Sequence, residues 1–204
     1  MTSEIDELAN QLAGFFQARE RLQTLYSREE LTDLTVPFIF LDSITGEPEI
    51  DAANGFLSFL CGTKVSAISA ILKGTPFLSE PFISLDQNVS IGKYFTNDNV
   101  FTSDSLAALT VIMPDGTVMT FGKKAFASVA GYRAIELFLG TKNLLGIPVK
   151  FVYKLQPDDL PLEIQKSLYS PSKPVTEFTG EDRKIILRMK SVYDPYHILN
   201  TFYL

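Results

Sequence analysis

The sequence has few of the residues that form metal or disulfide centres. Its 204 residues include a single cysteine, Cys61, a single histidine, His197, and no tryptophan. One cysteine excludes an internal disulfide and a thiolate metal cluster. One histidine, with no second histidine and no carboxylate at ligand spacing, does not predict a metal site. We therefore expect no metal, a structural role for His197, and a reducing, cytoplasmic location.

The sequence also lacks the signals of membrane insertion and of nucleic-acid binding. No apolar run reaches the ~20 residues that span a bilayer. The acidic start of the chain, with Glu4, Asp6 and Glu7, has the wrong sign for a secretory or transit peptide. Lysine and arginine number 18 against 24 acidic residues, and this net charge of −6 does not favour phosphate binding. We expect neither a membrane span nor a nucleic-acid partner.

The composition and the apolar patterns of the chain are those of an ordered globular protein. Hydrophobic residues make up 46% of the chain and charged residues 21%. Apolar residues at spacings of three and four predict an amphipathic helix over residues 3–26, capped by Ser3. Such a helix can dock a partner, although packing on its own core is the simpler interpretation. A capping-box turn over 27–30 and a strand over 36–41 follow.

One further helix is predicted in the middle of the chain. It covers residues 64–73, with Gly74 as its C-cap.

The stretch from residue 106 to residue 157 carries the clearest pattern. Pro-Asp-Gly between two apolar runs predicts a β-hairpin with its turn at residues 114–116. A helix and a last strand follow, separated by glycines. The predicted elements are strands 106–113 and 117–121, a helix over 132–139 that ends at Gly140, and a strand over 147–153. This order predicts a helix packed on a sheet.

The end of the chain predicts one more helix. Residues 158–178 contain three prolines and are expected to form a linker. A helix over residues 181–193 follows, capped by Thr179 and Asp182 and stopped by Asp194-Pro195. Its expected apolar stripe consists of Ile185, Ile186, Met189 and Val192. We therefore expect a core over 1–157, the linker 158–178, and a helix and tail over 179–204 that pack back on the core.

Three segments of the chain carry a resemblance to a known family. These segments are Val89–Gly92, the series Ala130-Gly131-Tyr132, Gly140, Gly146 and Ile147, and the terminal Tyr196–Asn200. Together they resemble the FAD-binding domain of flavoproteins of the vanillyl-alcohol oxidase and p-cresol methylhydroxylase type. The resemblance covers roughly residues 50–157 and 183–200, and it is nearest to the small flavin-domain subunit of glycolate-oxidase-like complexes. It implies an α+β fold with a mixed or antiparallel sheet flanked by helices, without a substrate (cap) domain. It also implies a short strand over residues 50–55 and a turn at residues 89–92.

The resemblance also implies a set of cofactor-binding residues. In the relatives, glycines at these positions let the backbone approach the isoalloxazine ring, the ribityl chain and the adenine of FAD. Position by position, the cofactor-binding residues implied here are Gly92, Gly131, Gly140, Gly146, Ile147 and Asn200. No catalytic residue is implied, because the chain contains no Ser-His-Asp set, zinc motif or phosphate loop.

The chain departs from the family where the cofactor is held. Bulky residues, Lys93, Tyr94 and Phe95, follow Gly92 where relatives have small ones, and Lys142 and Asn143 replace a glutamate and a glycine. Asn143 can still adopt the left-handed backbone conformation of a glycine. The glycine-rich loop that binds the FAD pyrophosphate in relatives has no counterpart among the first fifty residues.

Two hypotheses follow from these departures. The first is a non-catalytic, accessory subunit without cofactor, whose groove is filled by Tyr94, Phe95 and their neighbours. The alternative is an FAD-binding subunit of a 2-hydroxy-acid (glycolate-type) oxidoreductase complex, in which the cofactor would supply the chemistry. Both hypotheses predict a protein partner or a homo-oligomer.

Overall fold

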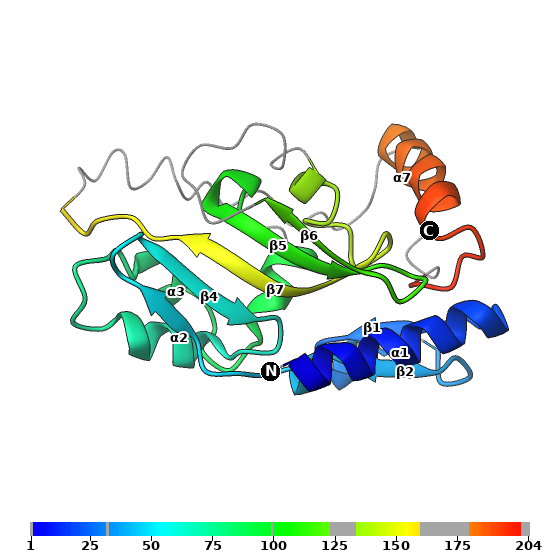
Figure 1. Cartoon of the computed structure of the whole chain (residues 1–204), viewed down its shortest axis with the longest axis horizontal. Coiled ribbons are helices and arrows are strands. Elements are labelled where there is room, and N and C mark those ends of the chain that lie inside the picture. The colour runs from blue at the N-terminus through cyan, green and yellow to red at the C-terminus, as the bar shows by residue number, and fades with distance from the viewer. Residues whose placement is uncertain (1, 32, 99, 123–133, 160–179, 201–204) are drawn as a thin grey trace.

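The computed structural model describes residues 2–31, 33–98, 100–122, 134–159 and 180–200. Its centre is a five-stranded antiparallel sheet with the strand order β3-β4-β7-β5-β6 (Figure 1). These strands are β3 (Glu49–Asp51), β4 (Phe56–Leu60), β5 (Leu106–Ile112), β6 (Val118–Gly122) and β7 (Ile147–Lys154). A separate small sheet pairs β1 (Gln23–Leu25) with β2 (Phe38–Phe40) in parallel.

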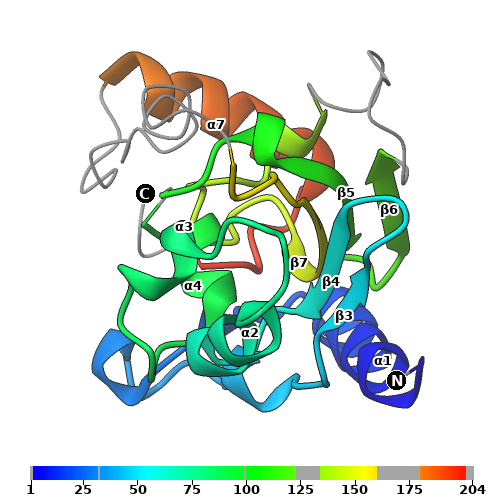
Figure 2. The ribbon, with the colours of Figure 1, turned by 90° about the vertical axis from the view of Figure 1, so that its left-hand side faces the viewer.

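Helices flank the five-stranded sheet. The α-helices are α1 (Thr2–Ala18), α2 (Val65–Leu72), α3 (Glu80–Ile83), α4 (Ile91–Thr96) and α7 (Gly180–Tyr193). Short 3-10 turns span Arg28–Glu30, Leu41–Ser43 and Ser103–Ser105. α2, α3 and α4 lie together on one side of the sheet (Figure 2), where Ile68, Phe82 and Phe95 are buried in the main core. The predicted α+β fold with an antiparallel, helix-flanked sheet is confirmed, and its flavin-domain type stays a prediction.

The central strand of the sheet is β7, which pairs with β4 on one edge and with β5 on the other. It carries the predicted strand of residues 147–153. Both of its faces are covered, so Val149, Phe151 and Val152 are all buried although they alternate between the faces. The loop that contains Gly140 and Gly146 leads directly into β7, so this loop ends at the middle of the sheet.

The β5–β6 hairpin has the predicted Pro-Asp-Gly turn. The Gly116 amide donates to the Met113 carbonyl at 2.9 Å, and the Met113 amide donates to the Thr117 carbonyl at 2.8 Å. Gly116 has a φ of +85°, the left-handed conformation that this turn requires at its last residue. The hairpin prediction is therefore confirmed, including the position of its glycine.

The first helix is shorter than predicted. α1 ends at Ala18 rather than continuing to residue 26, and residues 23–25 form the buried strand β1. The stop is a Schellman motif: Arg19 has a φ of +56°, and the Glu20 amide donates to the Phe15 carbonyl at 3.0 Å. Leu22 and Leu25 continue the helical spacing of α1, which explains the wrong prediction. The predicted cap, Ser3, has no described side chain.

Three further elements differ from what the sequence predicts or lie partly outside the described residues. Residues 89–92 do not form an isolated turn, because Ile91 and Gly92 are the first residues of helix α4. The strand β4 was not predicted, since all five of its residues are buried and show no alternation. Of the predicted helix 132–139, residues 134–136 are helical, and residues 132 and 133 lie outside the described part of the chain.

α7 confirms the predicted terminal helix but presents a different face. Ile186 is buried, whereas Ile185 and Val192 are 58% and 73% exposed. The inward position on the next turn is occupied by Lys190, which is fully buried. The predicted stripe is thus wrong for Ile185 and Val192. Lys190 takes the inward position because polar groups of the core bind it, so Ile185 and Val192 face away from the core.

The described part of the tail packs on the core. Leu199 forms a parallel bridge with Leu22, next to β1. Residues 160–178 of the predicted linker lie outside the described residues, so the three boundaries stay predictions. Among the residues described, no helix combines the length and the apolar character needed to cross a membrane.

Candidate functional site

The structure brings several of the predicted cofactor residues into one hydrogen-bonded cluster. Gly92 lies in α4, Gly140 lies in the loop before β7, and Asn200 lies in the tail. The Gly140 amide donates to the Phe95 carbonyl of α4 at 2.9 Å. The Asn200 side chain donates to the Lys142 carbonyl of the same loop at 2.6 Å. The loop before β7 therefore contacts both α4 and the tail.

Asn200 is the centre of this cluster. Its side-chain oxygen accepts the Thr24 amide at 2.8 Å, and its amide nitrogen donates to the Thr24 hydroxyl at 2.8 Å. Its own backbone amide donates to the Leu22 carbonyl at 3.0 Å. Asn200 is buried and has a φ of +45°, a conformation that asparagine tolerates better than most residues. The family-like asparagine thus fastens the tail to β1 and to the loop before β7.

Asn143 joins the cluster from the loop before β7. It has a φ of +59° and is buried, so the residue that replaces a family glycine does keep the left-handed backbone. Its amide nitrogen donates to the Thr24 hydroxyl at 3.1 Å. Its side-chain oxygen is buried, and no partner is present for it among the described residues. The Thr24 hydroxyl therefore receives hydrogen bonds from both Asn143 and Asn200.

Gly92 is held against the chain's own atoms. A Cβ at this position would lie 2.7 Å from the Cys61 carbonyl oxygen and 2.8 Å from the Tyr26 ring. The Gly92 amide donates to the same Cys61 carbonyl at 2.9 Å. The glycine is required here so that α4 can approach Tyr26 and the end of β4. Tyr26 is buried, and this burial raises its pKa well above the usual value.

The amides of the loop before β7 are used to cap α4. The Gly140 amide binds the Phe95 carbonyl, and the Lys142 amide donates to the Thr96 carbonyl at 2.8 Å. Both carbonyls belong to the last residues of α4, whose carbonyls lack partners within the helix. Gly140 and Lys142 have positive φ values of 67° and 52°, which turn their amides toward the helix. These donors therefore serve a helix terminus.

Gly146 and Ile147 are core residues at the start of β7. A Cβ at Gly146 would lie 2.8 Å from the Val111 side chain and 3.2 Å from the Phe138 ring. Ile147 is fully buried and pairs with Ile112 of β5. Gly131, the remaining predicted cofactor residue, lies outside the described part of the chain.

A buried ion pair lies next to the cluster and was not predicted. Lys190 of α7 donates to the Asp194 carboxylate at 2.7 Å, to the Leu144 carbonyl at 2.8 Å and to the Leu199 carbonyl at 2.7 Å. Both side chains of the pair are completely buried. Burial lowers the pKa of Lys190, and the Asp194 charge opposes this effect. Three acceptors match the three N–H donors of an ammonium group, so the pair links α7, the loop before β7 and the tail.

These residues do not fit a flavin in the arrangement that the structure shows. A flavin would need open space beside Gly92 and Gly146, but this space is filled by other atoms of the chain. The backbone amides of Gly140 and Lys142 already donate to carbonyls of α4. The groups next to Gly92 and Asn200 are Tyr26 and Thr24, not the Tyr94 and Phe95 expected from the sequence. Phe95 instead stacks on Phe101 in the core, with ring centroids 4.4 Å apart. FAD binding stays a prediction that this packing does not favour.

Cys61 and Tyr26 make the cluster sensitive to high pH. Burial raises the pKa of the Cys61 thiol from 9.0 to about 12. Below pH 9 the thiol is protonated in both the folded and the unfolded chain, so the free energy of unfolding is unaffected by it. Above pH 9 only the unfolded chain ionises, so stability falls as the pH rises toward 12.

We expect this thiol to lower the free energy of unfolding by about 1.4 kcal/mol at about pH 10 relative to neutral pH. Urea unfolding of the whole chain across this pH range measures the effect. In the control variant Cys61→Ala this contribution is removed, and the decline begins only where tyrosines such as Tyr26 titrate. Identical pH profiles for the two proteins would contradict the prediction.

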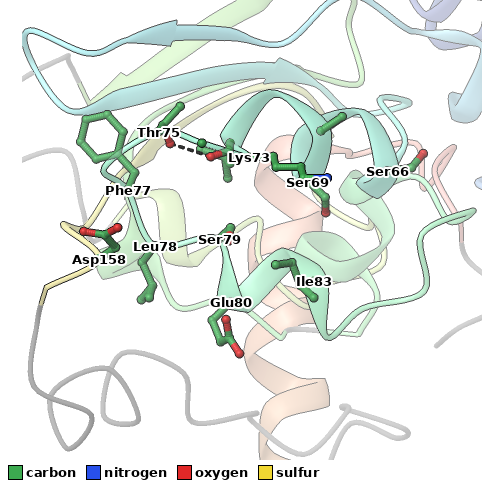
Figure 3. Close-up of a pocket in the computed structure, with 13 residues that line it drawn as sticks. Ser66, Ser69, Lys73, Thr75, Phe77, Leu78, Ser79, Glu80, Ile83 and Asp158 are labelled. Carbon is green, nitrogen blue, oxygen red and sulfur yellow. Dashed lines mark hydrogen bonds between the residues drawn. The ribbon is translucent and has the colours of Figure 1, made fainter.

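A second feature is an open groove of about 920 Å³ between α2, α3 and the segment that connects them (Figure 3). Ser69 of α2 and Ile83 of α3 lie on facing walls, and Lys73, Glu80 and Asp158 stand around the groove. The Ser69 hydroxyl is buried without a hydrogen-bond partner in the described residues. The volume is within the range of small-molecule sites, roughly 300–1,000 Å³. None of these residues was predicted to form a binding site.

His197 and the acidic residues form no metal centre in the described chain. His197 is exposed and has a φ of +53° in the turn after α7. The described residues contain no group of three histidine, cysteine or carboxylate side chains that is placed to hold an ion.

Comparison of the sequence with protein-family models and with curated proteins finds no match.

Proposed function

We propose that this chain is a divergent relative of the FAD-linked oxidases that acts as an accessory, non-catalytic subunit. One observation supports the proposal: Gly92 and Asn200, two of the residues expected to bind FAD, are in contact with Tyr26 and Thr24 of the chain itself. The chain keeps the loop, the helix and the terminal asparagine that resemble the family. It uses them to join its own segments.

The hydrogen-bond network supports this proposal energetically. Opening the cluster would expose the Thr24 amide, the Lys142 carbonyl and the Phe95 carbonyl, each of which now has a buried partner. A buried polar group that loses its partner costs about 1–3 kcal/mol. A flavin would have to compensate these losses before it contributed any net affinity, and the chain offers no predicted pyrophosphate loop to help it.

An accessory role further requires a surface for another protein. The groove between α2 and α3 carries the 55% exposed Ile83 and the unpartnered Ser69 hydroxyl. An exposed apolar side chain in a groove of this size offers another chain both a contact surface and a concave shape. We propose that this groove receives a segment of the partner protein.

Titration of the purified full-length chain with FAD tests the proposal. We expect a colourless protein that neither quenches the fluorescence of added FAD nor retains it through gel filtration. A reference flavoprotein, stripped of FAD and reloaded under the same conditions, is the positive control. Stoichiometric FAD binding by the isolated chain would contradict the proposal and favour the FAD-binding subunit of a 2-hydroxy-acid oxidoreductase complex instead.

A further inference from the structure

The two end strands of the five-stranded sheet differ in how they are protected. β3, at one end, consists of Glu49, Ile50 and Asp51, so charged residues stand at both of its ends. β6, at the other end, reads Val-Met-Thr-Phe-Gly and contains neither a charge nor a proline. Charges, prolines and short length are the usual means by which proteins prevent end strands from pairing with another chain. β6 lacks the first two, and within the described residues only β5 pairs with it.

Two of the three exposed side chains of β6 are also apolar. Val118 and Met119 are 42% and 43% exposed, and Thr120 is exposed. The pattern along the strand is three exposed residues followed by two that are half-buried. An uncharged, apolar end strand of this kind is a template for a further strand.

The register of the hairpin shows which backbone groups are available. The Met113 amide binds the Thr117 carbonyl, and hydrogen-bonded pairs alternate with non-bonded pairs along an antiparallel ladder. Thr120 faces Thr110 of β5 in a non-bonded pair, and the two hydroxyls are 3.1 Å apart. The N–H and C=O groups of Thr120 therefore point away from β5, toward the free side of the sheet.

We propose that β6 pairs with β6 of a second copy of this chain, antiparallel and with the two-fold axis at Thr120. In this register Thr120 faces its own copy through two backbone hydrogen bonds. Met119 of each chain then lies opposite Phe121 of the other, an apolar pair that favours association. No charged side chain of β6 has to be buried or placed against a like charge. The pairing joins two five-stranded sheets into one continuous sheet.

This inference goes beyond the proposed function and does not depend on it, because it involves neither the flavin-like cluster nor the α2–α3 groove. The two proposals therefore fail independently. A chain that binds FAD can still dimerise through β6, and a monomer can still exclude FAD.

The test is the mass of the full-length chain in solution, measured by light scattering after gel filtration across a wide dilution series. We expect a dimer of about 45 kDa, twice the 22.7 kDa of one chain. Thr120→Pro removes the outward N–H at a position where an end strand tolerates proline. It is expected to raise the dissociation constant of the dimer at least tenfold. Thr120→Val keeps the amide and is the matched control, which should remain a dimer.

A second variant covers the case in which Thr120→Pro does not fold. Met119→Lys leaves the backbone unchanged and places a charge on the end strand, so it should also give a folded monomer. Hydrogen exchange adds a direct readout, because the Thr120 amide should be protected in the dimer and exchange rapidly in Met119→Lys. A monomeric wild-type chain, or a dimer that survives both substitutions, would overturn the proposal.

Discussion

Replacing Lys190 with methionine is expected to lower the free energy of unfolding by about 3–5 kcal/mol, the cost of breaking a buried ion pair. Methionine matches lysine in helix propensity and nearly in shape, so the change removes the charge and the three donors. The Asp194 carboxylate keeps the Ile198 and Leu199 amides as donors, both at 2.9 Å. The Leu144 and Leu199 carbonyls lose their Lys190 donor. Urea unfolding followed by circular dichroism measures the loss.

The same helix provides the control for this substitution. Lys184 lies on the exposed side of α7, and Lys184→Met is expected to change stability by less than about 0.5 kcal/mol. The comparison separates the buried ion pair from the effect of methionine on α7 itself. Equal stabilities of the two variants would show that the link between α7, the loop before β7 and the tail contributes nothing to folding.

The elements that follow local rules could be predicted from the sequence. The β5–β6 hairpin depends on a Pro-Asp-Gly turn, and α2 ends at Leu72, just before Gly74, which has a φ of +81°. β1 could not be predicted in this way, because Leu22 and Leu25 continue the apolar spacing of α1. Its extended form is set by pairing with β2 and by the bridge between Leu22 and Leu199. Such contacts have no local signal.

The candidate site was predictable only in part, for a related reason. The family-like motifs pointed to Gly92, Gly140 and Asn200, and these residues do meet in one cluster. Their partners, Thr24 and Tyr26, lie in a segment that was predicted to be helical. The hydrogen bond from Asn200 to Thr24 joins residues 176 positions apart. The only local signal for the ion pair was Lys190 itself, a charged residue at an inward position of an otherwise apolar face of α7.

The structure shows what two of the predicted cofactor-binding glycines do for the fold. Gly92 allows α4 to lie against Cys61 and Tyr26, and Gly146 allows β7 to start against Val111. Binding a flat ring and packing two segments closely both require a backbone position without a side chain. The glycine pattern alone cannot distinguish these uses, whereas the atoms opposite each glycine can.

Gly116 tests this interpretation at a position far from the cluster, and Gly116→Ala is expected to destabilise the chain by about 2–4 kcal/mol. Two causes add together. The φ of +85° strains any residue with a side chain, and the new Cβ would lie 2.5 Å from the Ala9 carbonyl oxygen and 2.7 Å from the Ala13 Cβ. The hairpin turn or α1 would have to move, which would disturb the contact between them. Thermal unfolding of the variant measures the loss.

Gly14 of α1 is the matched control, because it lies one residue from Ala13 and a Cβ there meets no atom within 4 Å. Gly14→Ala should stabilise the chain by up to about 1 kcal/mol, since alanine is the better helix former in the interior of α1. The same chemical change thus has opposite signs at two nearby glycines. If both substitutions stabilise the chain, the β5–β6 turn does not pack on α1 as closely as described. A Cβ at Gly14 meets no other atom, whereas a Cβ at Gly116 would collide with α1. If Gly14→Ala also destabilises the chain, α1 itself is sensitive to the substitution, and the loss of stability in Gly116→Ala cannot be assigned to the turn.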